Sequence, residues 1–297
     1  MESRRALWHY HGNVEGRGEA RARRRHVLLT NQLNAVVTQR SEVAPGLLIL
    51  RVAPDGWSLP AFKPGQFAVL GLPAEASRHP LSDLEDPPAK PGSMVRRSYS
   101  IASSSRENEY LEFFLNFVRS GSLTPRLFSL GLGDRVWLGP KITGLFTFDQ
   151  VPPGANVVMV GTGTGLAPYM SMLRTFLDQQ QRRLAVIHGA RHSWDLAYRA
   201  ELVTMQRLRP NLAYFATVSR PDEEPVPWGG EVGRVQDVWL RRRVGGAWGV
   251  EPSPADTHLL LCGNPTMIGD MVALLASEGY SEHTRQQPGH VHVERYW

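Results

Sequence analysis

The sequence contains very little cysteine: Cys262 is the only one in 297 residues. A single thiol cannot form an internal disulfide, and an iron–sulfur cluster held by several thiolates of this chain is excluded. Long apolar runs are lacking as well, since no segment approaches the ~20 apolar residues that a membrane-spanning helix needs. The first residues also lack the apolar stretch of a secretory signal. We therefore expect a cytoplasmic protein in which any redox centre is organic.

The net charge of +5 is concentrated near the N-terminus. Residues 1–26 hold seven arginines and three glutamates, which leaves the rest of the chain nearly balanced. This composition predicts a disordered Arg-rich tail over residues 1–29. Contact with RNA or a membrane surface through the arginines is the alternative. The tail and the body of the protein therefore need separate explanations.

Two patterns of hydrophobicity divide the remaining chain. Residues 34–149 contain short apolar runs separated by turn residues, which predicts an antiparallel β-barrel. A proline-rich stretch, Pro73–Gly92, interrupts this rhythm, and we interpret it as a surface loop. After Pro152–Gly154 strands alternate with helices, which predicts a parallel sheet covered by helices. We therefore expect two domains, a β-barrel over 30–150 and an α/β domain over 151–297.

The expected elements follow from these runs. In the second half, apolar runs over 156–160, 184–190 and 257–262 predict strands, each followed by a helical pattern. In the first half, strands are predicted over 33–40, 46–52, 66–72, 96–103, 110–118, 134–139 and 144–149.

A glycine-rich turn follows the first of the later strands. Val160 ends an apolar run, and a helical pattern begins at Leu166 with Pro168 in its first turn, where the missing N–H matters little. Glycines would let the backbone approach a diphosphate, and the helix N-terminus would offer unpaired N–H groups to it. A tight strand-to-helix turn without a ligand is the alternative. The turn consists of Gly161, Thr162, Gly163, Thr164 and Gly165.

Two further segments in the barrel half suit a cofactor that has both phosphates and an aromatic ring. In one expected strand, Arg97 and Tyr99 are two residues apart and therefore share a face. A guanidinium binds phosphate oxygens in a fork, and a phenol offers a flat ring. Further on, Thr124 is expected to be an N-cap with Pro125 as the first helical residue, which gives a second helix start facing a phosphate.

Taken together and in this order, the motifs resemble the ferredoxin–NADP reductase family, especially its bacterial ferredoxin/flavodoxin reductases. The resemblance extends over residues 30–297 and includes both expected domains. It rests on Arg97-Ser98-Tyr99-Ser100, Gly121-Ser122-Leu123-Thr124, Gly161–Gly165, Cys262-Gly263-Asn264 and the segment Val293–Trp297.

The resemblance implies an FAD site in the barrel. Arg97 and its neighbour Ser98 would lie at the FAD diphosphate, Tyr99 would pack on one face of the flavin, and Ser100 would hydrogen-bond near flavin N5. Tyr296 would cover the opposite face, from which nicotinamide must displace it, and Trp297 would stack on the adenine. Backbone and hydroxyl groups of Gly121, Ser122, Leu123 and Thr124 would hold the other side of the diphosphate.

The resemblance also implies a catalytic group and an NADP(H) site. Ser100, Cys262, Glu294 and Tyr296 would surround the point where nicotinamide meets the flavin. Arg191 follows the expected strand 184–190, at a position where an NADH site tends to carry an acid. Arginines there suit the extra 2′-phosphate of NADP(H). The candidates are Arg191, Arg199, Arg174 and Arg220.

We therefore expect an FAD-dependent oxidoreductase that transfers electrons between NADP(H) and ferredoxin or flavodoxin, acting as a monomer. Histidines such as His290 and His292 lack a carboxylate or thiolate cluster beside them, so we expect no metal. A reductase component of an oxygenase system is the alternative enzyme, and nucleic-acid binding through the tail is the non-enzymatic alternative. Acidic carriers would be steered by a basic rim, for which the candidates are Arg207, Arg209, Arg241, Arg242 and Arg243.

Overall fold

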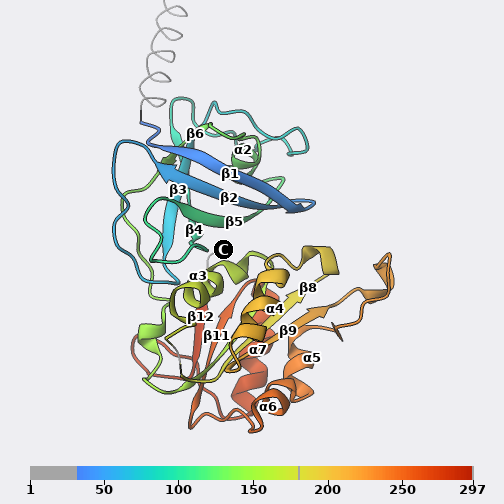
Figure 1. The fold of residues 1–297 in the computed structure, drawn as a ribbon. Coiled ribbons are helices and arrows are strands. Elements are labelled where there is room, and N and C mark those ends of the chain that lie inside the picture. Colours follow the sequence, from blue (N-terminus) through green and yellow to red (C-terminus); the bar gives the residue numbers. More distant parts are fainter. Residues whose placement is uncertain (1–31, 180, 296–297) are drawn as a thin grey trace, which may run out of the picture.

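The computed structural model describes residues 32–179 and 181–295 of the chain. The expected tail over residues 1–29 and the two aromatic residues Tyr296 and Trp297 lie outside this part. The described chain forms an antiparallel domain followed by an α/β domain, and the two are in contact (Figure 1). The predicted fold class is therefore confirmed.

Six antiparallel strands form the first domain, in the order β4-β3-β6-β1-β2-β5. A bridge between Ile101 and Phe113 joins the two ends of this order, which closes the sheet into a barrel. Apolar residues from alternate strand positions fill the inside, together with Leu127 and Phe128 of helix α2 (Thr124–Phe128). The strands are β1 (Ala35–Ala44), β2 (Leu47–Pro54), β3 (Phe67–Pro73), β4 (Met94–Ser100), β5 (Leu111–Asn116) and β6 (Arg135–Leu138).

The strand predicted over 144–149 is wrong. Thr143 makes a single bridge to Phe67, and a short 3-10 turn, Phe148–Gln150, follows. Phe146 and Phe148 are buried against the second domain rather than inside the barrel. These two side chains are apolar because they pack between the domains, so their alternation with polar residues does not indicate a strand here. The stretch Pro73–Gly92 is an irregular loop between β3 and β4, as predicted.

The second domain is a six-stranded parallel sheet in the order β10-β9-β8-β7-β11-β12. Strand order reverses direction beside β7, which is the place where α/β sheets open a crevice for ligands. The strands are β7 (Asn156–Thr162), β8 (Leu184–Ala190), β9 (Leu212–Val218), β10 (Glu231–Val232), β11 (Thr257–Cys262) and β12 (Val291–Glu294).

Helices cover both faces of this sheet (Figure 1). Two of them pack on the face that continues toward the barrel, namely α3 (Ala167–Phe176) and α4 (Arg199–Leu208). The other face is covered by α5 (Val235–Leu240), α6 (Arg243–Trp248) and α7 (Pro265–Ser277). Because α5 and α6 are only six residues each, their apolar residues show too little periodicity to predict a helix.

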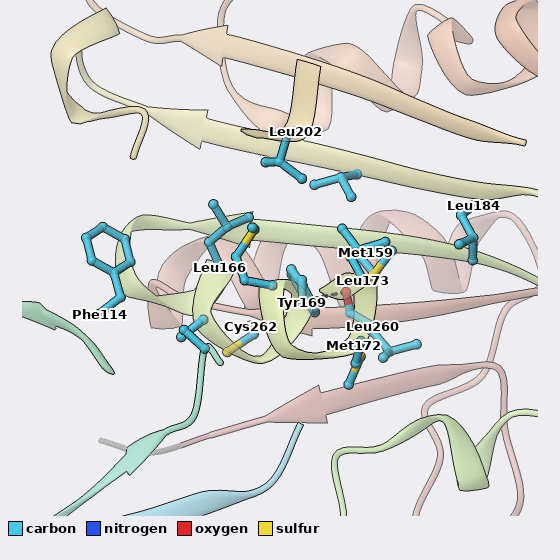
Figure 2. Close-up of a cluster of buried hydrophobic side chains, with 14 of the residues drawn as sticks. Phe114, Met159, Leu166, Tyr169, Met172, Leu173, Leu184, Leu202, Leu260 and Cys262 are labelled. Carbon is cyan, nitrogen blue, oxygen red and sulfur yellow. Dashed lines mark hydrogen bonds between the residues drawn. The ribbon is translucent and has the colours of Figure 1, made fainter. Parts of the chain in front are cut away.

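The two domains share one hydrophobic cluster (Figure 2). Phe114 of β5 and Phe146 from the barrel side join Met159, Tyr169 and Leu173 from the α/β side. The Tyr169 hydroxyl is fully buried and lies 2.9 Å from the Val160 carbonyl and 2.7 Å from the Leu260 carbonyl. This hydroxyl therefore ties α3 to two neighbouring strands while its ring fills the core.

A polar network crosses the same junction. Glu112 of β5 is 1% exposed and accepts hydrogen bonds from Arg51 (2.8 Å), Arg174 (2.7 Å) and the Tyr198 hydroxyl (2.8 Å). Arg174 also forms a two-bond pair with Glu201 of α4, at 2.7 Å for each bond. Burial alone would raise the pKa of Glu112, but the guanidinium of Arg174 and these hydrogen bonds outweigh it and lower that pKa. Glu112 is therefore a fixed negative charge that holds both domains.

Candidate functional site

A cleft of about 880 Å³ opens at the carboxyl edge of the parallel sheet. Residues that follow β7, β8, β9 and β11 line it on one side. The barrel closes the other side with Pro45, Leu47, Asn116 and Val118. The cleft therefore lies between the domains and at the reversal of strand order, where nucleotides bind in folds of this kind.

Only some residues of the glycine-rich turn line this cleft. Thr162, Gly163 and Thr164 line it, and Gly163 has a positive φ of 53° with no atom near the place of a Cβ. A Cβ on Gly161 would lie 2.9 Å from the Tyr169 ring, and one on Gly165 would lie 2.3 Å from the Cys262 carbonyl oxygen. Gly161 and Gly165 are therefore required for close packing, and their part in cofactor binding stays a prediction.

The turn is also fixed from the neighbouring strand. The Thr162 hydroxyl accepts a hydrogen bond from the Asn264 amide at 3.0 Å, and the Asn264 side chain caps α7 by accepting from Thr266 and Met267. Helix α3 begins after a 3-10 turn, Gly163–Leu166, with Pro168 in its first turn as predicted. Thr162 and Asn264 thus hold the ends of β7 and β11 together at the mouth of the cleft.

Ser100, Cys262 and Glu294 meet at the junction of the domains. Cys262 and Glu294 are register partners at the ends of β11 and β12, and Ser100 ends β4 of the barrel. One oxygen of Glu294 accepts from the Ser100 hydroxyl at 3.0 Å and from the Cys262 thiol at 3.4 Å. Burial raises the pKa of Glu294, although both hydrogen bonds oppose this. Three of the four predicted catalytic residues are thereby brought together, and the fourth, Tyr296, lies outside the described residues.

The remaining residues of the β4 motif present an aromatic ring beside a cation. Tyr99 is partly buried and packs edge-on against Phe113 at 6.5 Å between ring centroids. Burial raises the pKa of its hydroxyl, so Tyr99 stays neutral. Arg97 and Ser98 are exposed, and the Arg97 guanidinium bonds to the Arg96 carbonyl at 2.8 Å. In the described part of the chain no carboxylate pairs with Arg97, so this cation is available to an anion.

The turn that precedes α2 differs from our expectation. Leu123, not Thr124, is the N-cap, and the Thr124 hydroxyl bonds back to the Val118 amide and carbonyl at 3.2 Å and 3.3 Å. Thr124 therefore closes the Val118–Thr124 turn instead of capping a helix. Gly121 is tightly enclosed by this turn, since a Cβ on it would lie 3.1 Å from the Thr124 hydroxyl oxygen. Ser122 and Leu123 complete the turn, and Leu123 packs in the barrel core.

Two arginines line the end of the cleft that follows β8 and β9, and a third, Arg220, lies next to it and pairs with Glu223 at 3.2 Å. Arg191 lines the cleft directly after β8, and the Arg220 amide donates to the Arg191 carbonyl at 3.0 Å. Arg234, the N-cap of α5, lines the same cleft and is 4.0 Å from Asp270. Sequence reasoning missed Arg234. The sequence feature that could have indicated Arg234 is the pair Gly233–Arg234 before a short helix. Such pairs are too common to be singled out from sequence alone.

Two predicted cofactor arginines have other partners. Arg174 is held by Glu112 and Glu201 in the network between the domains. Arg199 lies over the Trp228 ring at 5.0 Å and lines a separate depression of about 700 Å³ beside β9. Neither Arg174 nor Arg199 lines the cleft, and their assignment to the cofactor stays a prediction. Arg174 is held by two carboxylates, and Arg199, unlike Arg191, lines the separate depression.

The histidines have different partners, and His192 lies 3.2 Å from an Asp195 oxygen and 2.7 Å from a Glu223 oxygen. His258 and His292 lie side by side on β11 and β12, with 3.0 Å between ring nitrogens, and buried His188 bonds to the Tyr214 hydroxyl at 3.1 Å. Across residues 32–179 and 181–295 no group of three or more His, Cys, Asp or Glu side chains could hold a metal ion. Among the helices of this same part, none is long and apolar enough to cross a membrane.

Comparison with known proteins agrees with this geometry. Residues 159–273 match the family model described as Oxidoreductase NAD-binding domain. The flavodoxin/ferredoxin–NADP reductase of Shigella flexneri is 32% identical over 238 residues, which is 80% of this chain and 88% of that protein. The ferredoxin–NADP reductase of Pseudomonas aeruginosa is 31% identical over 79% of this chain and 86% of its own.

A solved structure has the same fold. The ferredoxin NADP+ reductase of Neisseria gonorrhoeae, with bound FAD and NADP, superimposes with a TM-score of 0.72 at 22% identity over 89% of this chain and 98% of that one. The fold and the family model define an oxidoreductase. The chain belongs to the bacterial flavodoxin/ferredoxin–NADP reductase family.

Proposed function

We propose that the protein binds FAD and NADP(H) and transfers electrons between NADPH and a ferredoxin or flavodoxin. The observation that carries this proposal is the meeting of Ser100, Cys262 and Glu294 at the domain junction, beside a cleft lined by arginine. Bound FAD would take a hydride from nicotinamide and release single electrons to the carrier. The residues of this chain position the cofactors and orient protons around them.

The barrel offers groups that suit FAD. Arg97 is exposed without a carboxylate partner in the described chain, which suits a phosphate. Tyr99 is neutral and partly buried, which suits a flavin ring. Ser98 lies between these two residues, and Gly121, Ser122, Leu123 and Thr124 form the tight turn that would hold the rest of the diphosphate.

Glu294 gives the Ser100 hydroxyl two orientations. Protonated Glu294 can donate to Ser100, whose own proton then faces an acceptor on the cofactor. Ionised Glu294 accepts from Ser100 instead, as in the observed 3.0 Å bond, and the hydroxyl oxygen then faces a donor. Because burial raises the pKa of Glu294, the carboxyl changes state above the usual pH range of glutamate. Ser100 would thus match a cofactor atom that is an acceptor in one redox state and a donor in the other.

The cleft offers groups that suit NADP(H). Thr162, Gly163 and Thr164 present backbone to its diphosphate, and the open space beside Gly163 leaves room for it. Arg191, Arg220 and Arg234 would bind the 2′-phosphate. An acid at the end of β8 would favour NADH, and Arg191 stands there instead. The cofactor preference is therefore proposed to be NADPH.

The C-terminal residues remain part of the proposal. Tyr296 would cover the flavin face that nicotinamide takes, and Trp297 would stack on the adenine. Deleting Trp297 should weaken FAD retention, because stacking of a base on an aromatic side chain is worth roughly 1–3 kcal/mol. Deleting Tyr296 as well should tighten nicotinamide binding. Unchanged FAD affinity and NADPH kinetics in both truncated proteins would contradict these roles.

Exposed arginines would steer an acidic carrier toward the protein. Of the candidate rim, Arg241 and Arg243 pair with Glu231, and Arg242 pairs with Glu278. These three cations are partly neutralised by their partners. Arg207 and Arg209 are exposed, and within the described residues neither pairs with a carboxylate. They are therefore the better candidates for steering a carrier.

The deciding experiment is the visible spectrum of the purified full chain, followed by electron transfer to a carrier. We expect an oxidised flavin spectrum that NADPH bleaches without oxygen, and cytochrome c reduction that requires added ferredoxin or flavodoxin. A colourless protein would contradict the FAD assignment. Bleaching by NADPH with no transfer to either carrier would contradict the carrier assignment alone.

A further inference from the structure

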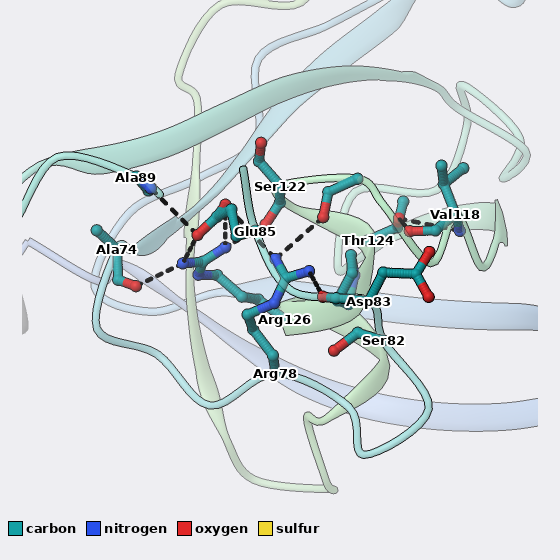
Figure 3. Close-up of polar contacts among 12 residues, drawn as sticks. Ala74, Arg78, Ser82, Asp83, Glu85, Ala89, Val118, Ser122, Thr124 and Arg126 are labelled. Carbon is teal, nitrogen blue, oxygen red and sulfur yellow. Dashed lines mark hydrogen bonds and ion pairs between the residues drawn. The ribbon is translucent and has the colours of Figure 1, made fainter. Parts of the chain in front are cut away.

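The loop between β3 and β4 is attached to α2 by a buried ionic cluster (Figure 3). Glu85 of the loop receives two hydrogen bonds from Arg126 of α2, each 3.0 Å, and lies 3.5 Å from Arg78 of the loop. The Arg126 side chain is 2% exposed, Glu85 is 11% exposed and Arg78 is 18% exposed. The hydrogen bonds from Arg126 lower the pKa of Glu85 to about 2, so the carboxyl stays ionised. Two cations therefore face one anion in a nearly closed site.

Each of these cations also donates to the peptide backbone of the turn before α2, and Arg78 reaches the Arg119 carbonyl at 3.4 Å as well as that of Gly121. Arg78 donates to the Gly121 carbonyl at 3.0 Å, and Arg126 donates to the Ser122 carbonyl. A trans peptide unit is planar, and its C=O and N–H point in opposite directions. The amides of Ser122 and Leu123 therefore point away from the two guanidinium groups. Within the described chain neither amide has a protein acceptor.

This arrangement strengthens an anion site on the far side of the turn. A carbonyl bonded to a cation polarises its peptide unit, which makes the attached N–H a better donor. One carboxylate neutralises only one of the two guanidinium groups, so a positive charge remains behind the turn in a region that water screens little. Such a charge is costly to bury unless another anion approaches. The direction of the Ser122 and Leu123 amides shows where that anion would sit.

From these contacts we infer that Arg78 and Arg126 are positioning residues, which hold and polarise the Ser122 and Leu123 amides toward the diphosphate of FAD. The inference rests on the proposed FAD site but adds residues that would never touch the cofactor. It also gives the β3–β4 loop a role, because the loop carries Arg78 and Glu85. The loop is then part of the machinery that retains FAD rather than a surface connection.

The test compares Arg78→Met and Arg126→Met with the control Arg119→Met in the full chain. Arg119 lies in the same turn, pairs with Asp83 at 3.0 Å, is 64% exposed, and its side chain donates to neither carbonyl. Its removal changes the net charge equally. Affinity for FAD is measured from the release of FAD when the holoenzyme is diluted. Affinity for riboflavin, which lacks phosphate, is measured on the full chain after its flavin has been removed. Only preparations whose circular dichroism matches that of the wild type are compared. Arg78→Met covers the case in which Arg126→Met does not fold.

We expect Arg78→Met to weaken FAD binding roughly tenfold, because the Gly121 carbonyl loses its charged donor. The riboflavin affinity of Arg78→Met, and both affinities of Arg119→Met, should stay at the wild-type values. Equal weakening of FAD and riboflavin would show a general structural role and overturn the inference. Unchanged FAD affinity in Arg78→Met would overturn it too. A wild-type chain that binds no FAD would instead overturn the proposed function from which the inference starts.

Discussion

Two carboxylates at the domain junction, Glu112 and Glu294, differ in the donors that face them. Glu112 accepts from two guanidinium groups and a phenol. Glu294 accepts from one hydroxyl and one thiol, and no cation pairs with it among the residues that the structure describes. The pKa of Glu112 is lowered and that of Glu294 is raised, although burial pushes both upward. Cationic partners, rather than depth, therefore decide whether a buried carboxyl is a permanent charge or can hold a proton.

The largest expected effect is the loss of stability in Glu112→Ala. This change leaves the guanidinium groups of Arg51 and Arg174 partly unpaired, so the free energy of unfolding should fall by about 3 kcal/mol or more. Chemical denaturation measures it. The control is Glu201→Ala, which removes the more exposed partner of Arg174 and should lower stability by no more than about 1 kcal/mol. Equal losses would mean that Glu112 is not the centre of the network.

Glu294→Ala should lower activity while leaving stability nearly unchanged. Without Glu294 the Ser100 hydroxyl loses its partner, so the rate of flavin reduction by NADPH should fall roughly 10²-fold. Glu294→Gln keeps a neutral donor and should recover part of the rate. Stopped-flow absorbance measures both variants, and Glu282→Ala, which removes the ion pair with Arg295, is the control.

The same variants test the pH dependence. In the wild type, flavin reduction should speed up as pH falls through the raised pKa of Glu294, because the protonated form lets Ser100 donate to the cofactor. Glutamine cannot titrate, so this step should be missing from the profile of Glu294→Gln. If Glu294→Gln keeps the wild-type profile, the titrating group is a different one.

Cofactor preference should depend on Arg191 and not on Arg199. Arg191→Ala removes a charged partner of the 2′-phosphate, so the ratio of kcat/KM for NADPH to that for NADH should fall roughly tenfold or more. Arg199→Ala removes the same charge from the separate depression beside Trp228 and should leave the ratio unchanged. A smaller ratio in Arg199→Ala would assign Arg199 to the cofactor site.

The smallest expected effect concerns how the stability of the protein changes with pH, since Glu112 and Glu294 should contribute to this change with opposite signs. Because its folded pKa is lowered, Glu112 stabilises the protein above its unfolded pKa, and this contribution is lost as pH falls through the folded pKa. Because its folded pKa is raised, ionised Glu294 destabilises the protein, and this disappears as pH falls below the unfolded pKa. Glu294→Gln should therefore melt slightly above the wild type at pH 7 and level with it in acid. Thermal melts over a pH series measure the difference.

Sequence reasoning predicted those features that depend on local pattern or on motif order. The change from short runs to strand–helix alternation predicted both domains, and the resemblance placed Ser100, Cys262 and Glu294 together. The sequence did not predict which arginines line the cleft between the domains. Arg174, Arg199 and Arg234 are distinguished by partners that lie far away along the chain. Gly161 and Gly165 raise the same difficulty for a prediction from sequence. A glycine required by a neighbouring backbone has the same sequence signal as one required by a ligand.

The hydrophobic cluster shared by the two domains has a consequence for how the protein unfolds. The rings of Phe146, before the α/β domain, and Tyr169 of α3 lie 6.0 Å apart in this cluster, so the apolar interior does not stop at the boundary. Domains with separate cores can melt one after the other or bend about a hinge. Here exposing the barrel side of the cluster would expose the sheet side as well. The chain should give a single calorimetric transition, and cofactors should exchange by local movements while the distance across the junction stays fixed.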